Sequence, residues 1–262
     1  MISVTVTSPS LDIAPQWDDL IQRAPANAFM NPAALKAAAD TMFALVHVLL
    51  AWDHDVEPAR LVGLWALQER NIMLFWPALL EGRPFNYAFL STPVIDPAFA
   101  SEVIPAFFAA IRNNPALPKV VSLKEMDAES QAFAAIRKTI AGEQHASLTL
   151  TQTGRPIVSR EAGLKNSGST RKKLRQDWNR LSALGALELV NARNANDARA
   201  AFEQFLTLEL RSWKGAEGTA ILCDDHDAEF TRRLIGDLAT IGNASVALLR
   251  LDGKAIAAQV VM

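Results

Sequence analysis

The sequence has few of the residues that build disulfide frameworks and metal centres. It contains one cysteine, Cys223, so no disulfide can form within the chain. Its four histidines, at positions 47, 54, 145 and 226, are scattered without the spacing of metal ligands. This composition predicts a protein of the reducing cytoplasm that holds no metal.

Long hydrophobic runs and an excess of one charge are also absent. No uninterrupted apolar stretch reaches the roughly 18 residues of a membrane-spanning helix, and the N-terminus lacks the basic start of a signal peptide. The formal net charge is -2, so the chain as a whole is not drawn to nucleic acid or to an anionic membrane. We therefore expect no membrane span and no DNA partner. Any anionic partner would need a local basic patch.

Apolar residues, in contrast, are abundant. Half of the 262 residues are hydrophobic, which is enough for one large domain or two of ordinary size. Periodic apolar positions divide the first half into strands and helices. The predicted strands cover residues 2–8, 43–51, 60–68, 72–77, 87–92, 119–124 and 145–153, and the predicted helices cover 16–23, 31–42, 97–113 and 128–141.

The second half repeats the opening of this order. The predicted elements are a helix at 169–184, a strand at 186–191, a helix from 197, a helix at 225–241, and strands at 245–251 and 255–262. The dipeptide Asp252-Gly253 between the last two strands is typical of a tight hairpin turn. The last strand stops at Met262 within an apolar run. Because natural domains seldom leave such a strand unpaired, we expect the chain to be truncated there.

One segment, residues 209–220, carries an aromatic residue, a lysine and two glycines at the end of a predicted helix. The three- and four-residue spacing of the apolar positions predicts that Trp213 lies on the buried face of that helix. Gly215 and Gly218 permit backbone conformations that other residues resist, so a ligand can approach the main chain there. The alternative is an ordinary helix end followed by a turn.

The predicted helix at 169–184 holds the main basic patch. Its cations are Arg171, Lys172, Lys173, Arg175 and Arg180, preceded by Lys165 and opposed by one acid, Asp177. Leu174, Trp178 and Leu181 form an apolar stripe along the same helix. The patch suits a phosphorylated or anionic ligand, but it is equally typical of the solvated face of an amphipathic helix.

The order strand, helix, helix, three strands, helix, strand is that of the GNAT acyltransferase fold, once in full and once cut short. The segment Arg211-Ser212-Trp213-Lys214-Gly215, followed by Gly218-Thr219-Ala220, a helix and the hairpin at 246–259, resembles the CelD-like branch of the GNAT superfamily. These proteins are described as acetyltransferases linked to cellulose or exopolysaccharide production. The branch is related to the FemAB aminoacyltransferases, which carry two GNAT-like domains in one chain.

The resemblance implies an α/β (α+β) chain of tandem GNAT-like domains with mostly antiparallel mixed sheets flanked by helices. The domains would span residues 1–157 and 158–262, the second incomplete. It also implies acetyl-CoA or another acyl-CoA as cofactor, with the main phosphate-binding loop beyond Met262. In the first domain the corresponding stretch has a single glycine, Gly82, and several prolines that remove backbone donors, so we expect no cofactor site there.

Acyl transfer needs a base for the acceptor's proton. Glu209, four residues before Trp213, is one candidate, and a plain ion pair with Lys214 or Arg211 is its alternative. His226 is a second candidate. Its alternative is a structural place in a helix N-terminus formed by residues 224–227. The candidates for the acceptor or phosphate side of a site are Arg171, Lys172, Arg175, Arg211, Trp213, Lys214, Gly215, Gly218 and Thr219.

These features together predict an acyl-CoA-dependent transferase that acts directly on a polysaccharide precursor, amino sugar or related small-molecule or saccharide acceptor. One alternative is a FemAB-like aminoacyltransferase that uses charged tRNA, which the acidic net charge disfavours. Another is an inactive tandem module that binds a partner in polysaccharide synthesis. A homo-oligomer is compatible with each of these alternatives.

Overall fold

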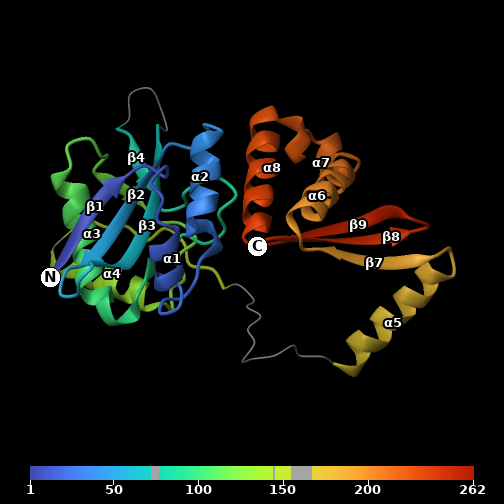
Figure 1. The fold of residues 1–262 in the computed structure, drawn as a ribbon, viewed down its shortest axis with the longest axis horizontal. Helices are drawn as coiled ribbons and strands as arrows, with labels where there is room; N and C mark the ends of the chain where they lie inside the picture. Colours follow the sequence, from blue (N-terminus) through green and yellow to red (C-terminus); the bar gives the residue numbers. More distant parts are fainter. Residues whose placement is uncertain (72–76, 144, 155–166) are drawn as a thin grey trace.

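The computed structural model describes residues 1–71, 77–143, 145–154 and 167–262, and these contain two separate β-sheets (Figure 1). The first sheet lies in the N-terminal part of the chain and the second in the C-terminal part. The predicted mostly antiparallel sheets flanked by helices are therefore present. The predicted domain boundary at residues 157 and 158 lies outside the described residues, as do most of the predicted strand 72–77 and Lys165.

The first sheet has the strand order β1-β2-β3-β4-β6, and β5 pairs with β3. All its strand pairs are antiparallel except β4 with β6. The strands are β1 (Ile2–Thr7), β2 (Val46–Asp53), β3 (Arg60–Arg70), β4 (Leu79–Glu81), β5 (Val94–Ile95) and β6 (Val120–Ser122). Both central strands, β2 and β3, are buried along most of their length, because helices cover both faces of the sheet.

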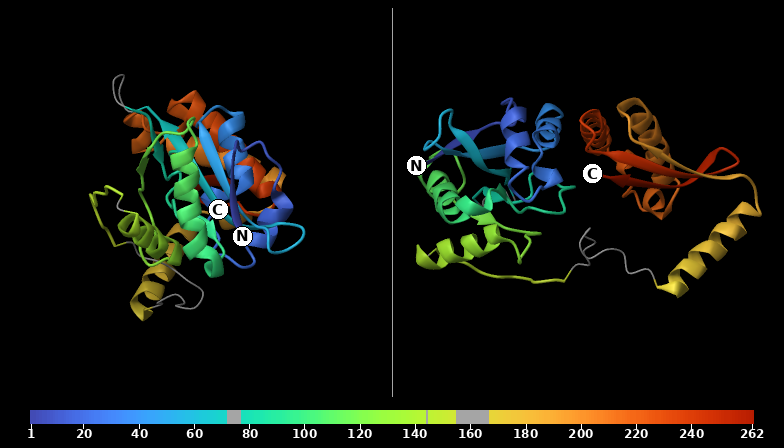
Figure 2. Two further views of the ribbon diagram at one scale, coloured as in Figure 1. Left: turned by 90° about the vertical axis from the view of Figure 1, so that its left-hand side faces the viewer. Right: turned by 60° about the horizontal axis from the view of Figure 1, so that its bottom comes forward.

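Those helices are α1 (Ala14–Leu20), α2 (Pro32–Asp40), α3 (Ala100–Asn113) and α4 (Gln131–Gly142), with the short 3-10 turns η1 (Ala28–Met30) and η2 (Pro97–Phe99). Figure 2 shows α1 and α2 on one face of the sheet and α3 and α4 on the other. The predicted cap of α2 is confirmed, because the Asn31 side chain accepts a hydrogen bond from the Ala33 amide at 2.9 Å. Within the described residues, no helix is both long and apolar enough to cross a bilayer.

The second sheet is antiparallel, with the order β7-β8-β9. Its strands are β7 (Leu187–Ala192), β8 (Ser245–Leu251) and β9 (Lys254–Val261), and the accompanying helices are α5 (Gly168–Ser182), α6 (Ala195–Leu210), α7 (Trp213–Ala216), η3 (Ile221–Cys223) and α8 (Asp225–Thr240). The predicted hairpin turn is confirmed: Asp252 and Gly253 both have positive φ, at 49° and 76°. A small core around Phe202, Leu206 and Leu248 lies between this sheet and α6.

Helix α8 takes part in both cores. Its Phe230 and Leu234 belong to the core of the first sheet, whereas Ile235 belongs to the core of the second. Phe230 stacks on Phe43 with ring centroids 4.1 Å apart and planes 6° from parallel. Helices α2 and α8 therefore lie side by side, as Figure 1 shows, and join the two sheets.

Two predicted strands are wrong. Residues 145–154 form no strand, and the leucines that suggested alternation, Leu148 and Leu150, are each 81% exposed. Alternation alone does not make a strand when no neighbouring strand accepts its hydrogen bonds. Residues 87–92 are also irregular, because the Asn27 side-chain amide bonds the carbonyls of Leu90 and Thr92 in place of a ladder.

Glu81, at the end of β4, is a buried carboxylate in the first sheet. Its side chain is 3% exposed and contacts Arg83 at 2.5 Å, Arg70 at 3.3 Å and Lys124 at 3.5 Å. Burial acts to raise the pKa of this carboxyl, but the hydrogen bond from Arg83 and the three cations lower it below its ordinary value near 4.5. The charged carboxylate therefore contributes stability above that value, and this contribution disappears as pH falls through the lower folded-state pKa.

We expect Glu81→Gln to reduce the free energy of unfolding at pH 7 by about 2 kcal/mol, because a buried carboxylate loses its charge-assisted hydrogen bond from Arg83 while the partly exposed cations stay solvated. Urea unfolding of both proteins at pH 7 and at acid pH measures the difference, which should shrink in acid. Glu143→Gln is the matched control, because Glu143 pairs with Arg112 at 2.8 Å in an exposed position. An equal loss in the control, or a difference independent of pH, would contradict this account.

Candidate functional site

The segment from 209 to 220 forms a compact turn, which we call the Trp213 loop (residues 211–221). Helix α6 ends at Leu210, and the one-turn helix α7 begins again at Trp213. Ser212 links the two helices: its hydroxyl donates to the Glu209 carbonyl at 2.7 Å and accepts from the Lys214 amide at 3.2 Å. The side chain thus caps α7 while holding it against the end of α6.

Glu209 fixes both sides of this loop. Its side chain is 8% exposed, and Oε1 lies 2.6 Å from Lys214 Nζ. Its other oxygen, Oε2, accepts a hydrogen bond from the Ile221 amide at 2.9 Å. The expected pair with Lys214 is therefore present, but the carboxylate is buried beneath the loop and joins its start and end to α6.

Every backbone amide from residue 214 to residue 221 donates a hydrogen bond within this segment. The acceptors are Ser212 Oγ and the carbonyls of Ser212, Trp213, Lys214 and Gly215, together with the Glu209 carboxylate. A phosphate-binding loop needs backbone amides that point towards the ligand. The Trp213 loop has its amides turned inward, so its main chain does not fit the pyrophosphate of an acyl-CoA.

The two glycines serve the shape of the loop. A Cβ atom on Gly215 would lie 1.8 Å from the Leu210 carbonyl oxygen, so only glycine permits this close approach of α7 to α6. Gly218 has φ of 70°, in the left-handed region that favours glycine, with open space around the position of a Cβ. Close packing accounts for Gly215 and backbone conformation for Gly218, without a ligand in either case.

Trp213 is 65% exposed, so its predicted burial is wrong. The prediction continued the apolar spacing of α6 past Leu210. Helix α6 ends at that residue, however, and α7 begins at Trp213 as a separate helix whose residues face other directions. Arg211 and Thr219 are exposed beside it, and the Thr219 hydroxyl donates to the Lys214 carbonyl at 3.3 Å. The loop thus presents an indole ring to solvent on a rigid base.

His226 lies exposed in the first turn of α8. The predicted helix N-terminus is confirmed, because Asp224 Oδ1 accepts from the amides of His226 at 2.8 Å and Asp227 at 3.2 Å. Cys223, just before this cap, is exposed. Among the described residues, no group of three or more His, Cys, Asp or Glu side chains is arranged to hold a metal ion.

A tyrosine from the N-terminal part reaches this same end of α8. The Tyr87 hydroxyl donates to Asp227 Oδ2 at 2.6 Å. Burial raises the pKa of Tyr87, and the bond to Asp227 and the charges of Asp227, Glu209 and Asp224 raise it further. Sequence reasoning missed this contact because residues 140 positions apart meet only through the packing of α8 on the first sheet.

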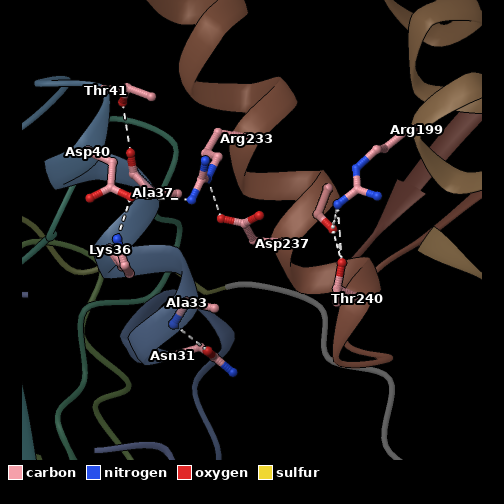
Figure 3. A network of polar contacts seen from close by, with 11 residues as sticks. Asn31, Ala33, Lys36, Ala37, Asp40, Thr41, Arg199, Arg233, Asp237 and Thr240 are labelled. Carbon is pink, nitrogen blue, oxygen red and sulfur yellow. Dashed lines mark hydrogen bonds and ion pairs between the residues drawn. The ribbon is translucent and has the colours of Figure 1, made fainter. Parts of the chain in front are cut away.

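A polar cleft of about 380 Å³ lies where α2, α6 and α8 meet, within the size range of small-ligand sites. It is lined by Asp40, Thr41, Arg199, Glu229, Arg232, Arg233, Gly236 and Asp237. Figure 3 shows that Arg233 reaches both Asp237, at 2.5 Å, and Asp40, at 3.3 Å. Arg199 donates to the Gly236 carbonyl and Arg232 pairs with Glu203. The three arginines are thus occupied in holding the helices together.

The basic residues predicted for a site lie on another element. Arg171, Lys172 and Arg175 are exposed on α5, which Figures 1 and 2 show reaching away from the start of β7, apart from α6 and α7. The structure therefore brings Glu209, Arg211, Trp213, Lys214, Gly215, Gly218 and Thr219 together, with His226 on the adjoining helix. It does not bring α5 to them.

Residues 168–262 match the profile of the protein family described as "Acetyltransferase (GNAT) domain". No curated protein and no solved structure matches the chain. The C-terminal part is thus a GNAT-type acetyltransferase domain, and the mixed α/β arrangement of sheets and helices is consistent with the acyl-CoA N-acyltransferase fold. This domain indicates an enzyme that transfers acyl groups.

The different roles of the two glycines predict different costs of substitution. Gly215→Ala should reduce the free energy of unfolding by about 3 kcal/mol, because the main chain of α7 must move away from Leu210. Gly218→Ala, the matched comparison, should cost only about 1 kcal/mol for the left-handed backbone. Urea unfolding of both variants measures these values, and similar costs for the two would contradict the close contact at Gly215.

Proposed function

We propose that the protein transfers an acetyl group directly to an amine or hydroxyl of a saccharide acceptor, such as a polysaccharide precursor or amino sugar, in the manner of CelD-like enzymes. The observation that carries the proposal is the GNAT domain at 168–262 with an exposed indole on a rigid loop beside its helices. An exposed aromatic ring suits a sugar acceptor, because its apolar face packs against the ring while hydroxyls stay in water.

We further propose that residues 1–157 form a first GNAT-like domain and 158–262 a second. The six-stranded sheet with helices on both faces supports this division, as does the contact of α2 with α8. In this arrangement the first domain supports α8 and supplies Tyr87 next to the Trp213 loop. The single cysteine supports a place in the cytoplasm.

The cofactor of this reaction would be acetyl-CoA or another acyl-CoA. The inward amides of the Trp213 loop and the pairing of Lys214 with Glu209 do not fit its phosphates. The loop therefore belongs to the acceptor side, where Trp213 and Arg211 contact the acceptor. Phosphate contacts by this loop play no part in the proposed transfer.

The two candidate bases differ in how far neighbouring groups already engage their side chains. Both carboxylate oxygens of Glu209 are engaged, one by Lys214 and one by the Ile221 amide, which suits a residue that positions the loop. His226 is exposed on the first turn of α8, and imidazole is the side chain most often used as a general base. We therefore assign proton removal to His226 and positioning to Glu209.

A second candidate function is a FemAB-like aminoacyltransferase that uses charged tRNA. The tandem arrangement and the basic helix α5 favour it, whereas the net charge of -2 does not. A non-catalytic binding module is the other alternative, favoured by the inward amides of the loop. Release of free CoA thiol from acetyl-CoA with a saccharide acceptor would identify the acetyltransferase. Release of uncharged tRNA from aminoacyl-tRNA with an amine acceptor would identify the aminoacyltransferase, and neither release would identify the binding module.

Trp213→Ala in the full-length protein should lower kcat/KM for the saccharide acceptor about tenfold, the effect of losing one aromatic contact of about 1.4 kcal/mol. Leu45→Ala is the matched control, because Leu45 is 61% exposed in the N-terminal part. Equal kcat/KM values for both variants and the parent would remove Trp213 from the acceptor site. Unfolding curves of the two variants should coincide with that of the parent.

His226→Gln should lower kcat by about a hundredfold with KM nearly unchanged, the smaller end of general-base effects. Glu209→Gln should instead raise KM for the acceptor, since its effect acts through the position of the loop. Steady-state kinetics of both variants make the comparison. A lower kcat with unchanged KM in Glu209→Gln, together with parent kinetics in His226→Gln, would reverse the assignment.

A further inference from the structure

Helix α5 is an element that no other part of the described chain buries. None of its residues from Gly168 to Ser182 is buried. In Figure 1 it extends from the start of β7 away from the rest of the second sheet. The proposed acyl transfer at the Trp213 loop leaves this helix without a role.

The helix carries an apolar stripe that faces solvent. Leu174 is 64% exposed and Trp178 is 44% exposed, and both lie on one face with the half-exposed Leu181 at four- and three-residue spacing. Leu184, just past the helix, is a further exposed apolar residue. An exposed apolar stripe rimmed by polar residues marks an interaction site.

Cations flank this stripe. The helix has five basic side chains, Arg171, Lys172, Lys173, Arg175 and Arg180, against one carboxylate, Asp177. Among the described residues, Arg180 is the only one of the five in an ion pair, at 3.6 Å from Asp177. The remaining positive charge on α5 is therefore available to an anionic partner.

The junction between α5 and β7 is held in place. The Ala186 amide donates to Asp252 Oδ1 and the Asp252 amide donates to the Ala186 carbonyl, each at 2.8 Å. Gly185 has φ of 159°, and a Cβ there would lie 2.3 Å from an Asp252 carboxylate oxygen. These contacts fasten the chain to the turn between β8 and β9 at the point just past α5 where it enters β7.

We propose that α5 is a docking surface for an anionic lipid membrane. An amphipathic helix with lysine and arginine beside a stripe of leucine and tryptophan lies in the membrane interface, its apolar side at the acyl boundary and its cations on the headgroups. The positive charge of α5 is complementary to the negative charge of anionic lipid headgroups, so the proposed membrane is an anionic one. Nucleic acid is less suited, because the only aromatic residue of α5 lies on the apolar stripe and none interleaves with the cations. The helix would bring the acyltransferase domain to acceptors at a membrane surface.

Co-sedimentation of the full chain with vesicles tests this role without reference to activity. Vesicles of phosphatidylcholine with about one third phosphatidylglycerol should bind the protein, neutral phosphatidylcholine vesicles should not, and binding should weaken as salt is raised. Lys172→Gln with Lys173→Gln should reduce the partition coefficient about thirtyfold, from the usual contribution of two basic residues near an anionic surface. The matched control is Arg137→Gln with Lys138→Gln, an exposed basic pair on α4, which should change binding less than about twofold.

Tryptophan fluorescence gives a second measurement. Binding to anionic vesicles should shift the emission of the parent to shorter wavelength, and Trp178→Phe should lose that shift. No sedimentation with anionic vesicles, equal binding to neutral ones, or an equal loss in the α4 control would overturn the proposal. Tighter binding to a short RNA duplex than to vesicles would also overturn it and assign the helix to nucleic acid.

Discussion

The stack of Phe230 on Phe43 is the contact on which the arrangement of the two sheets depends. It belongs to the core of the first sheet, yet Phe230 comes from α8, whose Ile235 packs in the core of the second. One helix thus joins two hydrophobic cores. Because α8 begins next to the Trp213 loop, the same packing sets Tyr87 and Asp227 beside the candidate site. A change that loosens the stack would move the site together with the helix.

Glu209 performs a comparable function within the C-terminal part. It is a buried carboxylate between Lys214 and the Ile221 amide, and it closes a loop whose amides from residue 214 to residue 220 also bond internally. The loop is therefore a rigid platform that exposes Trp213. Its glycines permit that platform to form, and its main chain does not serve as a phosphate cradle. The proposed acceptor surface of the C-terminal domain lies here, and the phosphates of the proposed cofactor would require other residues.

The features predicted correctly from the sequence are those decided by neighbouring residues. The cap at Asn31, the turn at Asp252-Gly253 and the start of α8 each depend on a few adjacent side chains. Trp213 was wrongly predicted to be buried because two non-helical residues separate α6 from α7, so the apolar spacing of α6 does not continue to it. The strand predicted at 145–153 does not form because no neighbouring strand pairs with it, which local alternation cannot reveal. The contact of Tyr87 with α8 depends wholly on tertiary packing.

Calorimetric titration of acetyl-CoA into the full-length protein tests most directly whether this is an acyltransferase with its acceptor surface at the Trp213 loop. We predict saturable binding of acetyl-CoA, with the same affinity in the parent and in Trp213→Ala, because the proposed contact of the indole is with the acceptor and not with the cofactor. Absence of binding to either protein would contradict the acyltransferase assignment. Binding that is lost only in Trp213→Ala would place the loop on the cofactor side and contradict its assignment to the acceptor.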